Sequence, residues 1–187
     1  LHQITQQPPV ATQTQAVQVQ SSPLELISQL GGGIWAVDVQ EQIAYVGVGP
    51  RLWVLDTRSN ELKVLGQSEV LSGKVRGVEV RDNYAYVATF YPVDDLVILD
   101  ISNPVQPRRI GQLNPPDCGG ALNLRLEGDL VYLACYHGLW IVDVSDPQAP
   151  VTLGHLELGM SATFFSLDVQ AGYAYLADEY QGLFVVD

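Results

Sequence analysis

Positive charge, long apolar runs and cysteine are scarce in this sequence, and each scarcity excludes a class of protein. Nine Lys and Arg stand against 21 Asp and Glu, and the resulting net charge of −12 argues against a nucleic-acid partner. No apolar run reaches the roughly 18 to 20 residues that span a bilayer, so this segment is not expected to insert into a membrane. The two cysteines have no second ligand at zinc-motif spacing, which leaves a disulfide as their alternative role.

The N-terminal segment lacks the features of a signal peptide, because no charged stretch followed by an apolar one opens the chain. The sequence starts at Leu1 rather than Met, so an upstream signal peptide that was removed stays an open alternative. Residues 1–22 are rich in Gln, Thr and Val and contain no acidic residue. Such a composition buries too little apolar surface to offset the entropy of ordering, so this segment is expected to be a flexible linker.

From Pro23 onward the sequence repeats itself. An apolar phrase that ends in aspartate occurs four times, and its aspartates are 44, 43 and 44 residues apart: Asp56, Asp100, Asp143 and Asp187. An alternating phrase with a central tyrosine precedes each copy, at Tyr45, Tyr86, Tyr132 and Tyr175. A third apolar phrase opens each unit, and three residues separate it from the tyrosine phrase. This pattern predicts a β-hairpin with a three-residue turn in every unit.

A turn and one further short apolar segment follow the aspartate, so each unit holds four short strands. Four strands per repeat of about 40 to 50 residues predict an all-β fold, a β-propeller whose four-stranded antiparallel blades occupy residues 23–187. Residues 24–30 match the fourth strand of the other units, and the chain stops after the third strand of its last unit. This N-terminal strand is therefore expected to complete the last blade.

The number of blades in the ring stays open between three alternatives. The four units close into a ring by themselves, belong to a chain of six to eight blades, or form an eight-bladed ring by self-association of two chains. We favour the second alternative as an expectation, because Leu1 is not a natural first residue and the chain ends directly after an apolar strand.

The four aspartate-ending phrases closely resemble the motif of the LVIVD-repeat family. The likeness includes the trailing prolines of residues 139–150 and covers about residues 24–187. It implies a bacterial or archaeal β-propeller, commonly part of an extracytoplasmic or cell-surface protein, and it brings no catalytic residues. The first unit departs from the pattern, because residues 57–63 replace the proline-containing turn of the second and third units.

Binding residues are expected on the loops between second and third strands, because these loops vary in length while the hairpin turns do not. The loops place aromatic residues beside acids, a combination that stacks on sugar rings or holds Ca²⁺. The candidates are Tyr91, Asp94, Asp95, Tyr136, His137, Asp178, Glu179 and Tyr180. Whether a metal binds there is left undetermined, no other cofactor is expected, and a plainly solvated loop face is the alternative.

Two further sets of acids recur with the repeat. Those that end the third-strand phrases precede turns, where a carboxylate accepts backbone N–H bonds, so they are expected to be structural. Those on the first strands either line the channel, where they would hold a cation, or face solvent: Asp38, Glu79 and Asp168.

A disulfide between Cys118 and Cys135 is compatible with the third hairpin. Pairing this hairpin sets Ala121 opposite Cys135, and Gly119 and Gly120 allow the chain to bend back to bridging distance. Such a bond is typical of an oxidising compartment, in agreement with the extracytoplasmic location that the resemblance implies.

The sequence thus favours a non-enzymatic binding or scaffold module that contacts a protein or a glycan through its loop rim. The alternative is a propeller hydrolase or lyase with a metal or acidic residues at the channel mouth. An enzyme requires several acids and His137 to converge on one pocket, and no Ser, His and acid spacing here is diagnostic of one.

Overall fold

The computed structural model describes residues 26–59, 61–90, 95–158 and 164–187 of the protein. These residues hold four antiparallel sheets and no helix. The first sheet consists of β1 (Ile34–Gln40), β2 (Ile43–Val48), β3 (Arg51–Asp56) and β4 (Lys63–Gln67). The second consists of β5 (Lys74–Arg81), β6 (Tyr84–Phe90), β7 (Leu96–Asp100) and β8 (Arg108–Leu113). The third consists of β9 (Ala121–Glu127), β10 (Leu130–Cys135), β11 (Gly138–Asp143) and β12 (Val151–Glu157), and the fourth of β13 (Phe164–Gln170), β14 (Tyr173–Asp178) and β15 (Gly182–Val186).

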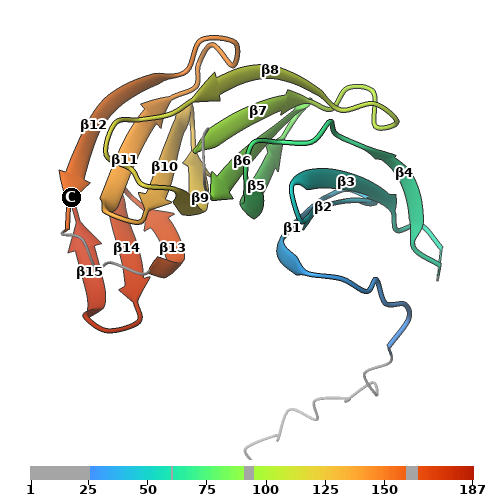
Figure 1. Ribbon diagram of the computed structural model, residues 1–187, viewed down its shortest axis with the longest axis horizontal. Coiled ribbons are helices and arrows are strands. Elements are labelled where there is room, and N and C mark those ends of the chain that lie inside the picture. Colours follow the sequence, from blue (N-terminus) through green and yellow to red (C-terminus); the bar gives the residue numbers. More distant parts are fainter. Residues whose placement is uncertain (1–25, 60, 91–94, 159–163) are drawn as a thin grey trace, which may run out of the picture.

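Each sheet is one propeller blade, as the repeat predicts. Its strands are hydrogen-bonded in sequence order, so each blade is a meander of neighbouring hairpins. Figure 1 shows the four blades side by side in an open arc, with the first strands β1, β5, β9 and β13 on its concave side. Within the described part of the chain, no helix is long and apolar enough to cross a membrane.

The hairpin that opens each blade has a two-residue turn rather than the three-residue turn that the sequence pattern predicts. Gln40 pairs with Ile43, so only Glu41 and Gln42 lie outside the ladder. The first turn residue has a positive φ in all four copies: Glu41, Asp82, Gly128 and Ala171. Two-residue turns with positive φ match the twist of the flanking strands, which explains why the ladder extends one residue further.

The hydrophobic core consists of separate layers between neighbouring blades. Tyr45 and Val54 of the first blade pack with Val78 of the second, and Tyr86 of the second packs with Leu124 of the third. The layer between the third and fourth blades is built in the same way. A blade with a neighbour on each side must be apolar on both faces, which explains the nearly continuous apolar runs of the third strands.

The turn after the repeated aspartate also contacts the blade before it. A Cβ atom on Gly66 of β4 would collide with the backbone oxygens of Pro104 and Val105, which belong to the turn of the second blade. A Cβ atom on Gly111 of β8 would collide in the same way with the backbone oxygen of Pro147 in the third blade. The glycine of the fourth strand in one blade therefore packs directly against the proline-containing turn of the next blade.

The expected N-terminal strand at residues 24–30 is not formed over its described part. Residues 26–30 belong to no strand, and Leu30 instead packs beside Ala44, Val46 and Leu55 of the first blade. The open edge of β15, which this strand was expected to join, lies at the opposite end of the arc (Figure 1). Residues 1–22, predicted to be a linker, lie outside the described residues.

Candidate functional site

The loops between second and third strands gather with the connections between blades on one rim of the arc, which we call the loop rim. The Val75 N–H, at the start of the second blade, donates to the Gly49 carbonyl in the β2–β3 loop at 2.9 Å. The Tyr136 N–H, in the β10–β11 loop, donates to the Gly120 carbonyl in the β8–β9 connection at 3.0 Å. Backbone bonds thus fix the β2–β3 and β10–β11 loops to the neighbouring chain connections.

A disulfide reinforces the rim between the second and third blades. Cys118 and Cys135 are bonded, with their Cα atoms 5.1 Å apart, and both cysteines are buried. The bend that brings them together uses Gly119 and Gly120, which have φ values of 73° and 108°. The ring of Phe90 lies so close to Gly120 that a side chain at this position would collide with it.

Among the predicted acidic residues of the rim, Asp178 holds the backbone of its own loop. Asp178 is buried, and its Oδ1 accepts the N–H groups of Tyr180 and Gln181 at 2.8 and 2.7 Å, so it fixes the β14–β15 loop. Asp95 is also buried, and its carbonyl accepts the N–H of Thr89 at 3.0 Å. Tyr91 and Asp94 lie outside the described residues.

The predicted aromatic residues and His137 occupy the same rim but do not form an acid–base centre. Tyr136, Glu179 and Tyr180 are exposed, and the negative charge of Glu179 is the main cause that raises the pKa of Tyr180. The Nδ1 atom of His137 lies 2.7 Å from the Asp117 carbonyl, which ties this ring to the β8–β9 connection. The described residues contain no cluster of three or more His, Cys, Asp or Glu that would hold a metal. Calcium binding at the rim stays a prediction.

Sequence reasoning missed the most distinctive group on the rim, which is built by a repeated β-bulge. The register shifts near the start of each first strand, between Ile34 and Ala36 in β1 and between Val75 and Gly77 in β5. The extra residues are Trp35 and Arg76. A bulge redirects the side chain of the extra residue. Here the two bulges bring the side chains of Trp35 and Arg76 into contact.

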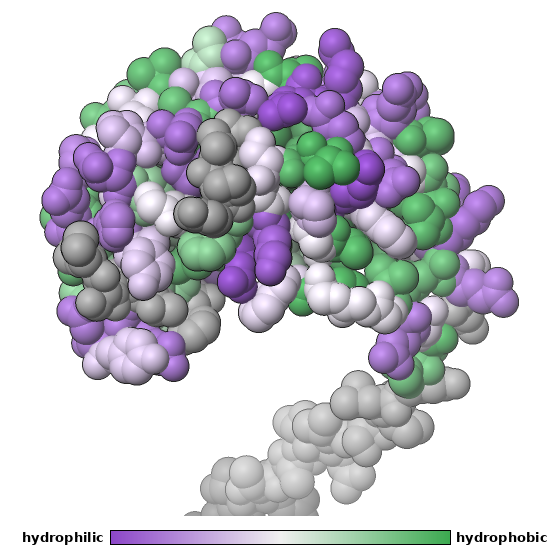
Figure 2. Space-filling view, viewed as in Figure 1, coloured by the Kyte–Doolittle hydropathy of each residue, from purple (hydrophilic) through white to green (hydrophobic). Residues whose placement is uncertain are grey.

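Arg76 lies between two aromatic rings. Its guanidinium carbon is 4.1 Å from the centroid of Trp35 and 5.4 Å from that of Phe90. Trp35 is nevertheless largely exposed, whereas the Nε of Arg76 is buried without a hydrogen-bond partner. Figure 2 shows the hollow of the arc, where strongly hydrophilic and hydrophobic residues lie side by side.

Arg76 differs from the other arginines that the structure describes. Arg51 donates to the Ser68 carbonyl. Each of the others has a carboxylate partner: Arg58, Arg81, Arg108, Arg109 and Arg125. Among the described residues Arg76 has neither kind of partner, although acids outnumber bases in the sequence by more than two to one. The only signal in the sequence is an arginine before the first-strand phrase, where the first unit has a tryptophan.

The acids of the first strands connect neighbouring blades rather than facing solvent alone. The Oδ2 of Asp38 accepts the N–H of Val80 in the next blade at 2.7 Å. The Oε2 of Glu79 accepts the N–H of Leu126 at 2.7 Å, and its Oε1 accepts a bond from Arg125 at 2.8 Å. Burial raises the pKa of Glu79, and these two donors partly oppose that rise. Cation binding at these acids stays a prediction.

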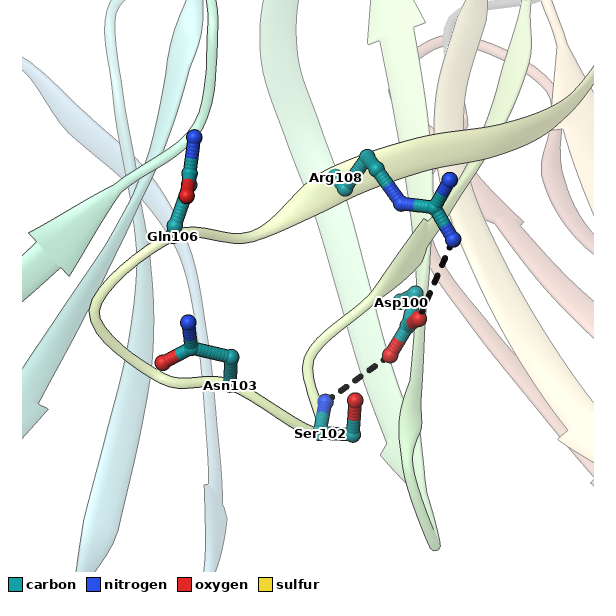
Figure 3. Close-up of a pocket in the computed structure, with 5 residues that line it drawn as sticks. All are labelled: Asp100, Ser102, Asn103, Gln106 and Arg108. Atoms are coloured by element: carbon teal, nitrogen blue, oxygen red, sulfur yellow. Dashed lines mark hydrogen bonds and ion pairs between the residues drawn. The ribbon is translucent and has the colours of Figure 1, made fainter.

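The acids that end the third strands fix the following turn, as their position predicts. The Oδ1 atoms of Asp56, Asp100 and Asp143 each accept the N–H two residues later, at 2.9, 3.0 and 2.8 Å. Around Asp100 the turn encloses a pocket of about 200 Å³, shown in Figure 3. The carboxylate there is already engaged by Ser102 and by Arg108 at 3.6 Å, so this pocket is the hollow of a structural turn.

Comparison with known proteins agrees with this architecture. The LVIVD repeat family matches residues 72–114, 118–156 and 165–187. An uncharacterised protein of Archaeoglobus fulgidus is 25% identical over 142 residues, which are 70% of this chain and 22% of that protein, so the chain spans about a fifth of this relative. The crystal structure of the computationally designed protein Ika4 has a TM-score of 0.69 at 13% identity and covers 88% of this chain and 98% of its own. The designed protein Ika8 has a TM-score of 0.67 at 13% identity, with 85% of this chain matching 48% of that one.

Proposed function

The chain belongs to the LVIVD-repeat family, and on this premise we propose that it is a non-enzymatic binding module whose loop rim takes a ligand that carries a carboxylate. The observation that carries the proposal is Arg76, whose buried Nε has no hydrogen-bond partner and whose guanidinium has no carboxylate partner among the described residues. Leaving a buried donor unsatisfied costs about 1 to 3 kcal/mol, and more when the donor is charged. An anionic ligand would supply the partner that the guanidinium charge lacks, and a planar carboxylate matches the guanidinium fork better than other anions of its size.

Trp35 adds an apolar contact beside this charge. One face of its ring lies against Arg76, while the side chain as a whole stays largely exposed. Exposed aromatic rings stack on sugar rings, and a carboxylated sugar offers an apolar ring face next to its charge. We therefore favour a glycan with a sugar acid over a protein partner. The net charge of −12 favours isolated carboxylates over a polyanion, because the field of the whole chain repels dense negative charge.

Nuclear magnetic resonance with D-glucuronate, and D-glucose as the uncharged match, tests this proposal. The indole N–H signal of Trp35 is expected to shift with glucuronate but not with glucose, while the signal of the buried Trp140 stays in place. Arg76→Met is expected to abolish the shift. Arg108→Met, which removes an exposed arginine far from the rim, is the control and is expected to keep it.

If the wild-type spectrum does not respond to glucuronate, the proposed sugar-acid ligand is wrong. If the Arg76→Met variant still responds, the proposed role of Arg76 in binding is wrong. A peptide that ends in a free carboxylate forms the second arm of the titration. A response to this peptide alone would assign the rim to a protein partner instead.

We also propose an extracytoplasmic location. The disulfide between Cys118 and Cys135 supports it, because such bonds persist in oxidising compartments. Mass spectrometry of protein that was alkylated directly in its native host is expected to find both cysteines protected. Alkylation of both thiols there would contradict the proposal.

A further inference from the structure

The two end blades of the arc each leave apolar side chains of one sheet face exposed, and these faces match each other. We call the sheet face that points toward the next blade in the chain the following face, and the one that points toward the previous blade the preceding face. At each of the three junctions within the chain, the following face of one blade packs on the preceding face of the next. The following face of the fourth blade has no neighbouring blade among the described residues. The preceding face of the first blade has none either, although Leu30 packs on part of it, at Ala44, Val46 and Leu55. Figure 1 shows these blades at the two ends of the arc.

The following face of the fourth blade carries side chains that are buried in the other three. The tyrosine of the second strand is 5%, 0% and 6% exposed at Tyr45, Tyr86 and Tyr132, but 37% exposed at Tyr175. The first leucine of the third-strand phrase is at most 2% exposed in the first three blades and 67% exposed at Leu183. Val185 of β15 is exposed as well. The side chains that form a packing face in the other blades therefore stay exposed here in the described part of the chain.

The preceding face of the first blade likewise exposes side chains that are buried in the other three blades. The residue that opens the first-strand phrase is at most 6% exposed in the second, third and fourth blades, where it is Val78, Leu124 and Leu167. In the first blade it is Val37, which is 62% exposed, and Val39 beside it is also exposed. Burying apolar side chains of this size stabilises a structure, so each face is a favourable place for a partner.

The polar atoms of the two faces match as well. Asp38 and Glu79 each accept an N–H from the first strand of the next blade, at Val80 and Leu126. Asp168 stands at the same repeat position in the fourth blade, and its side chain is 78% exposed. The Val39 N–H, which here donates to the adjacent Asp38, stands where Val80 and Leu126 stand. A blade seated on the fourth one would therefore bring the Val39 N–H to Asp168.

We propose that the two faces bind each other between two copies of this chain, so that two arcs join head to tail into a ring of eight blades. Within one chain the faces lie at opposite ends of the open arc (Figure 1). A second copy supplies both missing faces at once and creates two identical junctions, each a repeat of those within the chain. Ika8, of which this arc matches 48%, shows that a single chain can hold about twice this length of the same fold. Eight blades lie within the range of known propellers.

Light scattering after size-exclusion chromatography of the full chain tests the proposal. The wild type is expected to have twice the chain mass of 20.4 kDa. Val37→Asp and Leu183→Asp, which charge one face each, are both expected to be monomers with unchanged circular dichroism. Val105→Asp, at an exposed valine in the turn after β7, is the control and is expected to stay a dimer.

A mixture of the two face variants distinguishes head-to-tail association from any other arrangement. Val37→Asp keeps an intact following face and Leu183→Asp an intact preceding face, so the mixture can form one undamaged junction. We expect a dimer in the mixture, although neither variant dimerises alone. Three results would overturn the proposal: a wild type that is monomeric up to about 100 µM, a single face variant that stays dimeric, or a mixture that stays monomeric. A dissociation constant of about 100 µM corresponds to a weak interface of about 5.5 kcal/mol.

Discussion

At the scale of single residues, the repeat gives the same carboxylate the same structural task in successive blades. The acid that ends the third strand receives an N–H from the turn in three blades, so the turn starts in the same conformation each time. The acid of the first strand reaches the next blade in two of them. Arg125 occupies the third such position, where it bonds Glu79 and lies 3.7 Å from Asp168. These acids hold the scaffold, which leaves Arg76 and the exposed aromatic rings for binding.

The turn acids predict how stability depends on pH. Hydrogen bonds and the charge of Arg58 lower the pKa of Asp56 from 3.8 to about 2, and hydrogen bonds from Ser102 and Ser145 lower the pKa values of Asp100 and Asp143. A carboxyl whose pKa is lower in the folded state stabilises the fold above its unfolded pKa and loses this effect as the pH falls through its folded pKa. Stability is therefore expected to fall between about pH 4 and pH 2.

Urea unfolding of the wild type and of Asp56→Asn across this pH range checks the prediction. The amide of asparagine still accepts the turn N–H groups but does not titrate. The unfolding midpoint of the variant is therefore expected to fall less steeply below pH 4. Parallel curves for the two proteins would show that Asp56 does not contribute to the acid sensitivity.

Residue roles differ in how far the sequence alone could predict them. The turn role of Asp56 follows from a local rule, because the acceptor and the N–H are two residues apart. The Cys118–Cys135 pairing required the hairpin register as well, and two glycines supplied the missing bend. Arg76 and Trp35 were missed because they meet only through bulges in strands of two different blades. A bulge shifts register without a clear signal in the alternation of apolar residues.

At the scale of elements, the fold depends on how closely each turn approaches the preceding blade. The glycine of the fourth strand and the proline-containing turn of the next blade are about one repeat apart in sequence, and the repeat preserves both. Gly154 of β12 is the third such glycine, and no atom lies within 4 Å of its Cβ position. Among the described residues, no turn therefore packs on Gly154.

Gly111→Ala and Gly154→Ala form a matched pair that tests this contact. The alanine at position 111 must push back the Pro147 carbonyl, because backbone cannot rotate away as a flexible side chain can. Overpacking of this kind costs about 1 to 3 kcal/mol of unfolding free energy, whereas Gly154→Ala is expected to change it by less than about 0.5 kcal/mol. Urea denaturation measures both values. Equal effects at the two positions would mean that the turn contact does not determine the role of this glycine.

The repeat also explains why the strands were more predictable than their ends. Alternating and continuous apolar runs located β1 to β15 in the sequence, because each strand has a fixed neighbour on at least one face. The hairpin turns were placed correctly but one residue too long, since ladder length depends on turn conformation. The strand expected at residues 24–30 did not form over residues 26–30, because its edge partner β15 belongs to the other end of the arc.

At the scale of the whole molecule, the chain is an arc whose two ends are complementary. The three junctions within the chain serve as a template for a fourth junction between two chains. In that junction the carboxylate of Asp168 would accept the N–H of Val39. A closed ring would also fix the distance between opposite parts of the loop rim. The binding rim and the assembly are nevertheless independent claims, because Arg76 and Trp35 meet at a junction within the chain.

The most direct measurement is a cysteine crosslink across the proposed junction. Asp168→Cys combined with Val39→Cys is expected to give, after mild oxidation, a covalent product of twice the 20.4 kDa chain mass on a non-reducing gel. Asp38→Cys combined with Val80→Cys occupies the same two repeat positions within the chain and is expected to crosslink without a change in mass. If the control pair forms its bond while the 39/168 pair forms none, or forms one only within a single chain, the head-to-tail ring of two copies is contradicted.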